Sequence, residues 1–135
     1  MKAITKMIFI SIIFLMTTAC ATTPFKLAEK YNLDNELTET KEIYKFRVKS
    51  WEAVDYQSLI LRTDVDDYYL IILQRPTRSL PFAENIAITD SFEGIKPGLD
   101  NVIVVDSAGA ESYVIQKIYK LKDRQQANEI KKRLG

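Results

Sequence analysis

Apolar and polar residues alternate along Ile43–Trp51 (IYKFRVKSW), where strand-like patterning begins. The apolar positions of this alternation are Tyr44, Phe46 and Val48. A period of two predicts a strand with one buried face and one face in solvent. After a short polar turn, Ser58–Arg62 (SLILR) predicts a second strand.

The most hydrophobic run of this region is Tyr68–Leu73 (YYLIIL), six apolar residues without a break. A strand of this kind is usually covered on both faces, so we expect it at the centre of a sheet. The polar loop before it contains Asp64, Asp66 and Asp67, residues that favour a turn.

Three more strands are predicted after an interruption at Gln74–Glu84, where two prolines each remove a backbone donor. Within and just after this interruption, three apolar residues have the spacing of one helical turn, namely Leu80, Ala83 and Ile86. The strands are expected at Asn85–Thr89, Val102–Asp106 and Ser112–Leu121, the last of them bent near Gln116. The glycine of SAGA predicts a tight hairpin between the last two.

The last periodic stretch predicts a helix. Asp123 can cap its start, and Gln126 has the spacing of a capping box. Ala127, Ile130 and Leu134 recur at helical spacing and form one apolar face. Six short strands and one helix predict a mainly β fold, a small antiparallel six-stranded barrel or curled sheet with the helix across an open edge. The alternative is a two-layer α+β sheet.

Residues 1–19 have the composition of an export signal. Lys2 and Lys6 make the start positive, and Met7–Met16 (MIFISIIFLM) is apolar. This apolar run is too short to cross a bilayer, which takes about 20 residues of helix. We therefore interpret residues 1–19 as a signal peptide that is removed.

Cys20 is the single cysteine of the chain and follows the small residues Thr17, Thr18 and Ala19. The arrangement resembles the bacterial lipobox, with Thr17 at the position of the usual large aliphatic residue. This resemblance implies cleavage before Cys20 and its lipidation by acyl chains such as palmitate. The alternatives are a secretory signal cleaved near Ala19 or Ala21, which leaves a free thiol, and a short buried helix.

Lipidation would attach the protein to a membrane of the cell envelope. Ala21 follows Cys20, and it is not the aspartate associated with inner-membrane retention in enteric bacteria. By that resemblance we expect the protein on the inner leaflet of the outer membrane, facing the periplasm.

Residues 20–42 are then expected to form a tether, and residues 43–135 the domain. Thr23 and Asn32 could bound a weak helix within the tether. The run Leu33–Glu42 (LDNELTETKE) is polar with little to bury, so we expect it to be extended or mobile.

Charge and composition limit the chemistry. The whole chain has 19 basic and 18 acidic residues, and residues 1–19 carry two lysines and no acid, which leaves 17 and 18, a net charge of −1. This balance argues against a nucleic-acid binder, which needs a basic face. The chain has no histidine, which excludes His-based triads and His-ligated metals. We expect no cofactor and no metal, although a carboxylate pair or a carboxylate-only metal site stays open.

Two sets of acids are candidates for a site. Asp64, Asp66 and Asp67 supply oxygen ligands that calcium prefers, but the spacing of a calcium-binding loop is missing, which favours a solvated turn. Asp55 and Asp100 could act as a catalytic pair only if their surroundings set different pKa values. As single acids in turns before strands, both are interpreted as turn formers.

Aromatic and basic residues offer two further candidates. An aromatic floor for a ligand could combine Trp51 with Tyr44, Tyr68 and Tyr69, but aromatic residues at strand spacing more often belong to the core. An anionic group such as a lipid headgroup or a glycan acid could bind the arginines at positions 62, 75 and 78, although isolated surface arginines are common.

The interruption between the strands is the candidate partner-binding segment. It combines Arg75 and Arg78 with Leu80 and Phe82, and arginine and aromatic side chains are frequent interface residues. Two prolines stiffen it, so that it loses little entropy on docking. The alternative is that Leu80, Phe82 and Ala83 only fill the end of the barrel.

Several motifs between Ile43 and Leu121 are similar to those of a family of proteobacterial exported proteins and lipoproteins known only as a domain of unknown function. The residues that carry the resemblance are Trp51, Val54–Leu61, Tyr68–Leu73, Leu80, Ala83, Ile86, Asp100 and Ile115–Leu121. The family has no assigned reaction, so the resemblance implies no activity. Some members carry paired cysteines near the central loop, and this chain has none there, so no disulfide is implied.

These observations lead to an expectation for function. We expect a membrane-anchored periplasmic lipoprotein that is not an enzyme and serves as an accessory or binding module for an envelope partner. A small-ligand-binding barrel and a hydrolase that uses carboxylates alone are the alternatives.

Overall fold

The computed structural model describes residues 27–44, 47–90 and 94–135. Within these ranges the helical elements are η1 (Glu29–Tyr31), η2 (Leu80–Phe82) and α2 (Arg124–Leu134). The strands are β1 (Thr38–Glu39), β2 (Ile43–Tyr44), β3 (Val48–Ala53), β4 (Ser58–Thr63), β5 (Tyr68–Leu73), β6 (Asn85–Ile88), β7 (Gly94–Ile95), β8 (Asn101–Asp106) and β9 (Gly109–Leu121).

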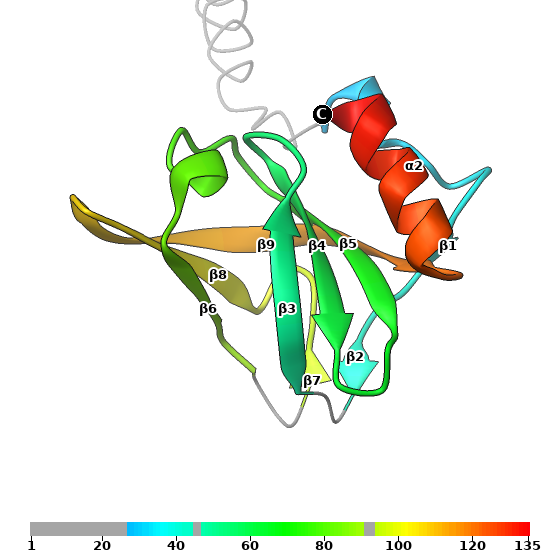
Figure 1. The fold of residues 1–135 in the computed structure, drawn as a ribbon, viewed down its shortest axis with the longest axis horizontal. Helices are drawn as coiled ribbons and strands as arrows, with labels where there is room; N and C mark the ends of the chain where they lie inside the picture. The colour runs from blue at the N-terminus through cyan, green and yellow to red at the C-terminus, as the bar shows by residue number, and fades with distance from the viewer. Residues whose placement is uncertain (1–26, 45–46, 91–93) are drawn as a thin grey trace, which may run out of the picture.

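The main sheet is antiparallel and curls into a half-barrel (Figure 1). Its strand order is β3-β4-β5-β9-β8-β6, and β1 adds to β9. The long strand β9 joins the two halves, because its first part pairs with β8 and its second part with β5. The predicted mainly β fold, a curled six-stranded sheet with a C-terminal helix, is confirmed.

A bulge lies where β9 passes from one half to the other. Ile72 pairs with Lys117 and Leu73 with Ile115, so Gln116 is the extra residue. A bulge bends its strand and increases the twist. The bend predicted near Gln116 therefore matches an irregularity of the ladder, and it is where the sheet turns.

The central strand β5 is buried on both faces, as its sequence predicted. Ile71 and Leu73 belong to a core cluster on the inside of the curl, which also contains Leu80. Leu70 and Ile72 belong to a second cluster on the opposite face, beneath α2. The sheet therefore separates two cores, and β5 contributes to both.

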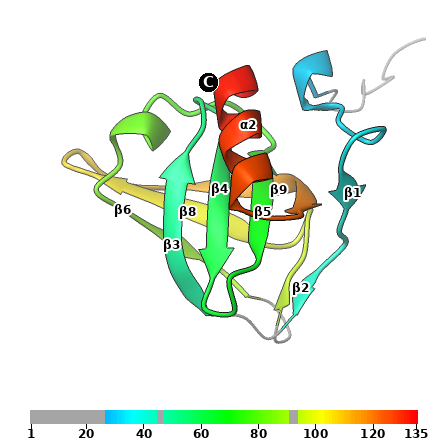
Figure 2. The same ribbon diagram turned by 45° about the vertical axis from the view of Figure 1, so that its right-hand side comes forward.

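Helix α2 covers the second core (Figure 2). Asp123 Oδ1 accepts a hydrogen bond from Gln126 N at 2.9 Å, so the predicted cap is confirmed. Gln126 Oε1 in turn accepts from Lys122 N at 2.7 Å. Ala127 and Ile130 are buried against the sheet, which is the apolar face that the sequence predicted.

The strand predicted over Ile43–Trp51 is wrong in its extent and in its buried face. Ile43 and Tyr44 form β2, which pairs with β7 in a separate two-stranded sheet. A bulge between Val48 and Ser50 then shifts the alternation of β3, so that Trp51 and Ala53 pack on the core. Tyr44 and Val48 are 59% and 43% exposed, and Phe46 lies outside the described residues.

The segment before Ile43 is more buried than the predicted tether. Leu33 and Leu37 are 5% and 6% exposed and belong to the second core, and β1 pairs with β9. The expectation that Leu33–Glu42 has little to bury is therefore wrong. The predicted helix is reduced to η1, which Asn32 caps at its C-terminus, and Thr23 lies outside the described residues.

Polar contacts also fix this segment to β9. Tyr119 is fully buried, and its hydroxyl accepts from Leu33 N at 3.0 Å and donates to Asp34 Oδ1 at 2.8 Å. Lys117 Nζ lies 2.7 Å from Asp34 Oδ1. Burial disfavours the charged Lys117, but its interactions with Asp34, Tyr119 and Glu39 together outweigh burial and raise the Lys117 pKa.

Candidate functional site

The interrupting segment between β5 and β6 divides into a buried part and an exposed part. Leu80 is fully buried in the inner core, where it fills the end of the curled sheet. Phe82, two residues later, is 75% exposed. Leu80 therefore agrees with the alternative in which the segment fills the core, and Phe82 does not, because the short η2 turn directs Leu80 inward and leaves Phe82 outside.

Phe82 lies beside a solvent-open cavity of about 510 Å³. The residues that line it, which we call the Tyr56–Phe82 surface, are Tyr56, Pro76, Thr77, Arg78 and Phe82. Tyr56 comes from the turn between β3 and β4 and is 53% exposed. The exposure of two large aromatic side chains beside one cavity is unusual, because burial of such side chains stabilises a folded domain.

Thr77 joins the two parts of the Tyr56–Phe82 surface, which are the β3–β4 turn with Tyr56 and the segment between β5 and β6. The backbone N–H of Thr77 donates to the carbonyl oxygen of Tyr56 at 2.7 Å. Thr77 is 2% exposed, and its Oγ1 accepts from Ser79 N at 3.2 Å. These contacts fix the two loops relative to each other, so the surface is preformed.

The two arginines of the segment differ in their surroundings. Arg75 lies over the ring of Tyr113, 4.3 Å from its centroid, and Arg75 Nη2 is 3.2 Å from Glu111 Oε1. Hydrogen bonds from Tyr113 and Arg75 lower the pKa of Glu111. Arg78 is exposed and has no ion-pair partner among the residues that the structure describes. Arg78 is therefore the cation of this segment that a ligand can reach.

The turn that carries Tyr56 is held by Asp55. Asp55 Oδ1 accepts from Gln57 N and Ser58 Oγ, both at 2.8 Å, which closes the turn. Asp55 Oδ2 accepts from Tyr31 Oη at 2.7 Å and from Lys30 Nζ at 2.8 Å. Asp55 thus joins the β3–β4 turn to the N-terminal segment.

The surroundings of Asp55 favour its charged form. Burial acts against the carboxylate, but the four hydrogen bonds that Asp55 accepts together outweigh it and hold the Asp55 pKa below its usual value. Burial and the hydrogen bond to Asp55 raise the pKa of Tyr31. The interpretation of Asp55 as a turn former is correct, and its link to residues 30 and 31 had no signal in the sequence.

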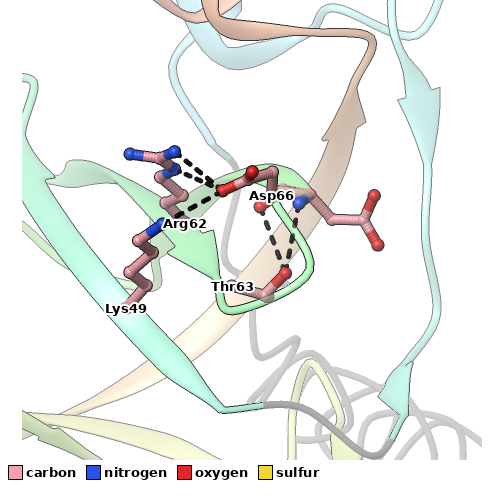
Figure 3. A network of polar contacts seen from close by, with 5 residues as sticks. Lys49, Arg62, Thr63 and Asp66 are labelled. Atoms are coloured by element: carbon pink, nitrogen blue, oxygen red, sulfur yellow. Dashed lines mark hydrogen bonds and ion pairs between the residues drawn. The ribbon is translucent and has the colours of Figure 1, made fainter.

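A second, smaller hollow lies between α2 and strands β3 to β5. Its volume is about 290 Å³, and Ser50, Glu52, Arg62, Tyr68 and Arg124 supply most of its polar lining. Arg62 is already engaged, because its Nε and Nη2 donate to Asp66 Oδ1 at 3.0 and 2.7 Å (Figure 3). This hollow is therefore a weaker candidate than the Tyr56–Phe82 surface.

Asp66 belongs to the β4–β5 turn. It has a positive φ of 62°, and Lys49 Nζ also approaches its Oδ1, at 3.5 Å. The hydrogen bond from Arg62 and the charges of Arg62 and Lys49 lower the Asp66 pKa. Asp64 and Asp67 flank it in the same turn, and among the described residues no group of three possible metal-ligating side chains occurs.

The candidate aromatic floor, which the strand spacing of these residues disfavoured, does not form. Trp51 and Tyr69 pack on the inner core, whereas Tyr68 packs on the second core across the sheet. Tyr44 is exposed on β2. Because these side chains lie on different faces, the core interpretation holds for three of them and is wrong for Tyr44.

Asp100 is fully buried and shapes the loop before β8. Its Oδ2 accepts from Lys96 N at 2.7 Å, and its Oδ1 from Thr89 Oγ1 at 3.2 Å. None of these partners belongs to the contacts of Asp55 described above. The two acids therefore serve separate turns, as their sequence positions suggested.

The sequence missed Tyr56, Pro76 and Thr77 as members of the candidate site. An aromatic residue in a polar turn, as Tyr56 is in AVDYQ, was the available signal.

Cys20 lies outside the described residues. The helices that the structure describes, η1, η2 and α2, all fall short of the length and hydrophobicity that crossing a bilayer requires.

Comparisons with known proteins give one match. The model of a family described as "Family of unknown function (DUF6491)" matches residues 1–134. Searches among curated proteins and among solved structures returned no match. Since the family model covers nearly the whole sequence, this chain belongs to DUF6491, a family of unknown function.

Proposed function

We propose that this protein is an exported lipoprotein that acts as a non-enzymatic binding module of the cell envelope. Acyl chains on Cys20 hold it on the inner leaflet of the outer membrane, facing the periplasm. The sequence of residues 1–20 supports this proposal, with two lysines, an apolar run and small residues before the single cysteine.

The observation that carries the binding role is the Tyr56–Phe82 surface. Tyr56 and Phe82 stay exposed beside an open cavity, on loops that hydrogen bonds hold in place. Exposed apolar groups of this kind on a folded domain are typical of interaction sites. Arg78 adds an accessible cation to them.

The two alternative functions have less support. A small-ligand barrel needs room inside the curl, but Leu80, Ile95 and their neighbours fill the inner core. A carboxylate hydrolase needs two acids that face one substrate. Asp55 and Asp100 instead accept hydrogen bonds from the turns around them.

The anchoring half of the proposal is tested by Cys20→Ser, with Thr22→Ser as the matched control. We expect the control to fractionate with membranes and to carry acyl chains, and the Cys20→Ser variant to be released or left unprocessed. If the Cys20→Ser variant is cleaved at the same bond, acylated and membrane-bound, lipidation of Cys20 is wrong.

The binding half is tested by crosslinking in cells followed by mass spectrometry. A photo-crosslinking amino acid at position 82 should give a defined adduct, and the same amino acid at Val65, which is 72% exposed in the β4–β5 turn, should not. Equal labelling from both positions would mean that the Tyr56–Phe82 surface binds nothing in particular.

A further inference from the structure

We infer that the Tyr56–Phe82 surface rests on the phospholipid headgroups of the membrane that holds the lipid anchor. The inference depends on the proposed lipidation of Cys20, and it assigns the partner of the proposed binding surface. Its occupant is a lipid surface and not a protein.

The described part of the chain begins at the end of the molecule that carries this surface. Lys30 and Tyr31 bind Asp55, and the next residue along the turn is Tyr56. Tyr56 is in turn bonded to Thr77 in the other half of the surface. Figures 1 and 2 both show the first described residues, in blue, at the same end as the β3–β4 turn and the C-terminus of α2.

The distance from the anchor is short. Leu27, the first described residue, packs on the second core and is seven positions after Cys20. Seven residues span at most about 25 Å when fully extended. A domain of this size is roughly 30–35 Å across. The β4–β5 turn lies at the opposite end of the strands, so it is held farther from the lipid than the Tyr56–Phe82 surface.

The chemistry of this surface suits a headgroup layer. Tyrosine prefers the membrane–water interface, where its ring meets apolar groups and its hydroxyl meets water, and phenylalanine can enter the acyl boundary. Arg78 provides a cation next to both rings. Cations beside an anionic leaflet are attracted to it over roughly a Debye length.

A second pair of cations lies near the same end. Lys131 and Lys132 line a hollow together with Val54, the residue that begins the β3–β4 turn. Lys131 is ion-paired with Glu52, and Lys132 is exposed. Two exposed acids, Glu29 and Glu84, also lie near the Tyr56–Phe82 surface. The electrostatic attraction to anionic headgroups is therefore limited to Arg78 and Lys132 and does not come from an extended basic surface.

The test uses the full chain with its N-terminal segment, expressed in bacteria, with benzoylphenylalanine in place of Phe82. A second protein carries the same amino acid in place of Val65. After irradiation, membranes are isolated, and peptides are analysed for phospholipid and protein adducts. We expect phospholipid adducts at position 82 and none at position 65.

The charge contribution is measured in the same cells. Arg78→Glu in the position-82 protein should lower the phospholipid adduct by roughly tenfold, because it reverses the charge next to the crosslinker. Lys49→Glu is the matched control, since Lys49 lies at the β4–β5 end and binds Asp66. We expect Lys49→Glu to leave the adduct unchanged.

Four results would overturn the inference, and they separate it from the proposed function. A chain that is acylated and membrane-bound but gives protein adducts at position 82 assigns the surface to a protein partner. An acylated chain with no phospholipid adduct at position 82, or with equal phospholipid adducts at 65 and 82, refutes membrane contact alone. A chain without acyl chains refutes both the lipid anchor and the membrane contact that depends on it.

Discussion

Leu37→Ala tests whether the segment before Ile43 belongs to the folded domain. Leu37 is 6% exposed and packs in the second core beneath α2. Truncation of a buried leucine to alanine costs about 2–5 kcal/mol of unfolding free energy, from lost burial and the cavity left behind. Because the segment can partly collapse around the cavity, we expect the lower part of this range, about 2–3 kcal/mol.

The assay is thermal unfolding of the chain without residues 1–20, followed by circular dichroism. For a domain of this size, each kcal/mol shifts the melting temperature by about 4–8 °C, so Leu37→Ala should lower it by roughly 10 °C or more. Leu99→Ala is the matched control, because Leu99 is 64% exposed. Equal melting temperatures for the two variants would mean that residues 27–42 are a tether after all, as the sequence alone predicted.

Three further predictions concern the core, the candidate segment and pH. Ile71→Ala, in the fully buried central strand, should cost about 2–5 kcal/mol in urea unfolding, whereas Lys49→Ala should stay within about 0.5 kcal/mol; equal costs would refute the assignment of β5. Leu80→Ser should destabilise the domain and Phe82→Ser should not, and the reverse order in thermal melts would exchange their roles. Asp55 has a lowered pKa, so its stabilising effect is present above the unfolded-state pKa of about 3.9 and is lost as pH falls through the lower folded value. The free energy of unfolding in urea should therefore fall more for the wild type than for Asp55→Asn between neutral pH and about pH 3. Parallel curves of this free energy against pH would contradict the network around Asp55.

The sheet was predictable because its central strands carry strong local signals. Tyr68–Leu73 is apolar at every position, and the structure buries it on both faces as expected. The cap of α2 could be predicted equally well, since the aspartate and glutamine at positions 123 and 126 form their hydrogen bonds within one turn. In both cases a short stretch of sequence is enough to determine the structure.

Other features depend on contacts that no local pattern contains. The bulge at Lys49 changes the face of the sheet on which the following residues of β3 lie. The alternation of apolar and polar residues in the sequence does not show where such a bulge occurs. Leu33 and Leu37 lie among polar residues, so the local sequence pattern does not indicate their burial. Their burial follows from β1 pairing with β9, a strand about 80 residues later.

The candidate site was half predicted. Arg78 and Phe82 were chosen from the residue types that often form interfaces, and both line the cavity. Leu80 and Arg75 do not, because Leu80 is in the core and Arg75 is held against Tyr113 and Glu111. Tyr56 completes the surface from a turn distant in sequence, and its hydrogen bond to Thr77 is one of the contacts that join the two loops.

The most direct test of the account is the mass of the N-terminal peptide of the protein extracted from membranes. The full chain is expressed, extracted with detergent and digested, and the first peptide is measured by mass spectrometry. We predict a peptide that begins at Cys20 and carries acyl chains. A peptide that begins at Ala21, an unmodified Cys20, or an intact segment 1–19 would contradict the lipid anchor and the membrane orientation inferred from it.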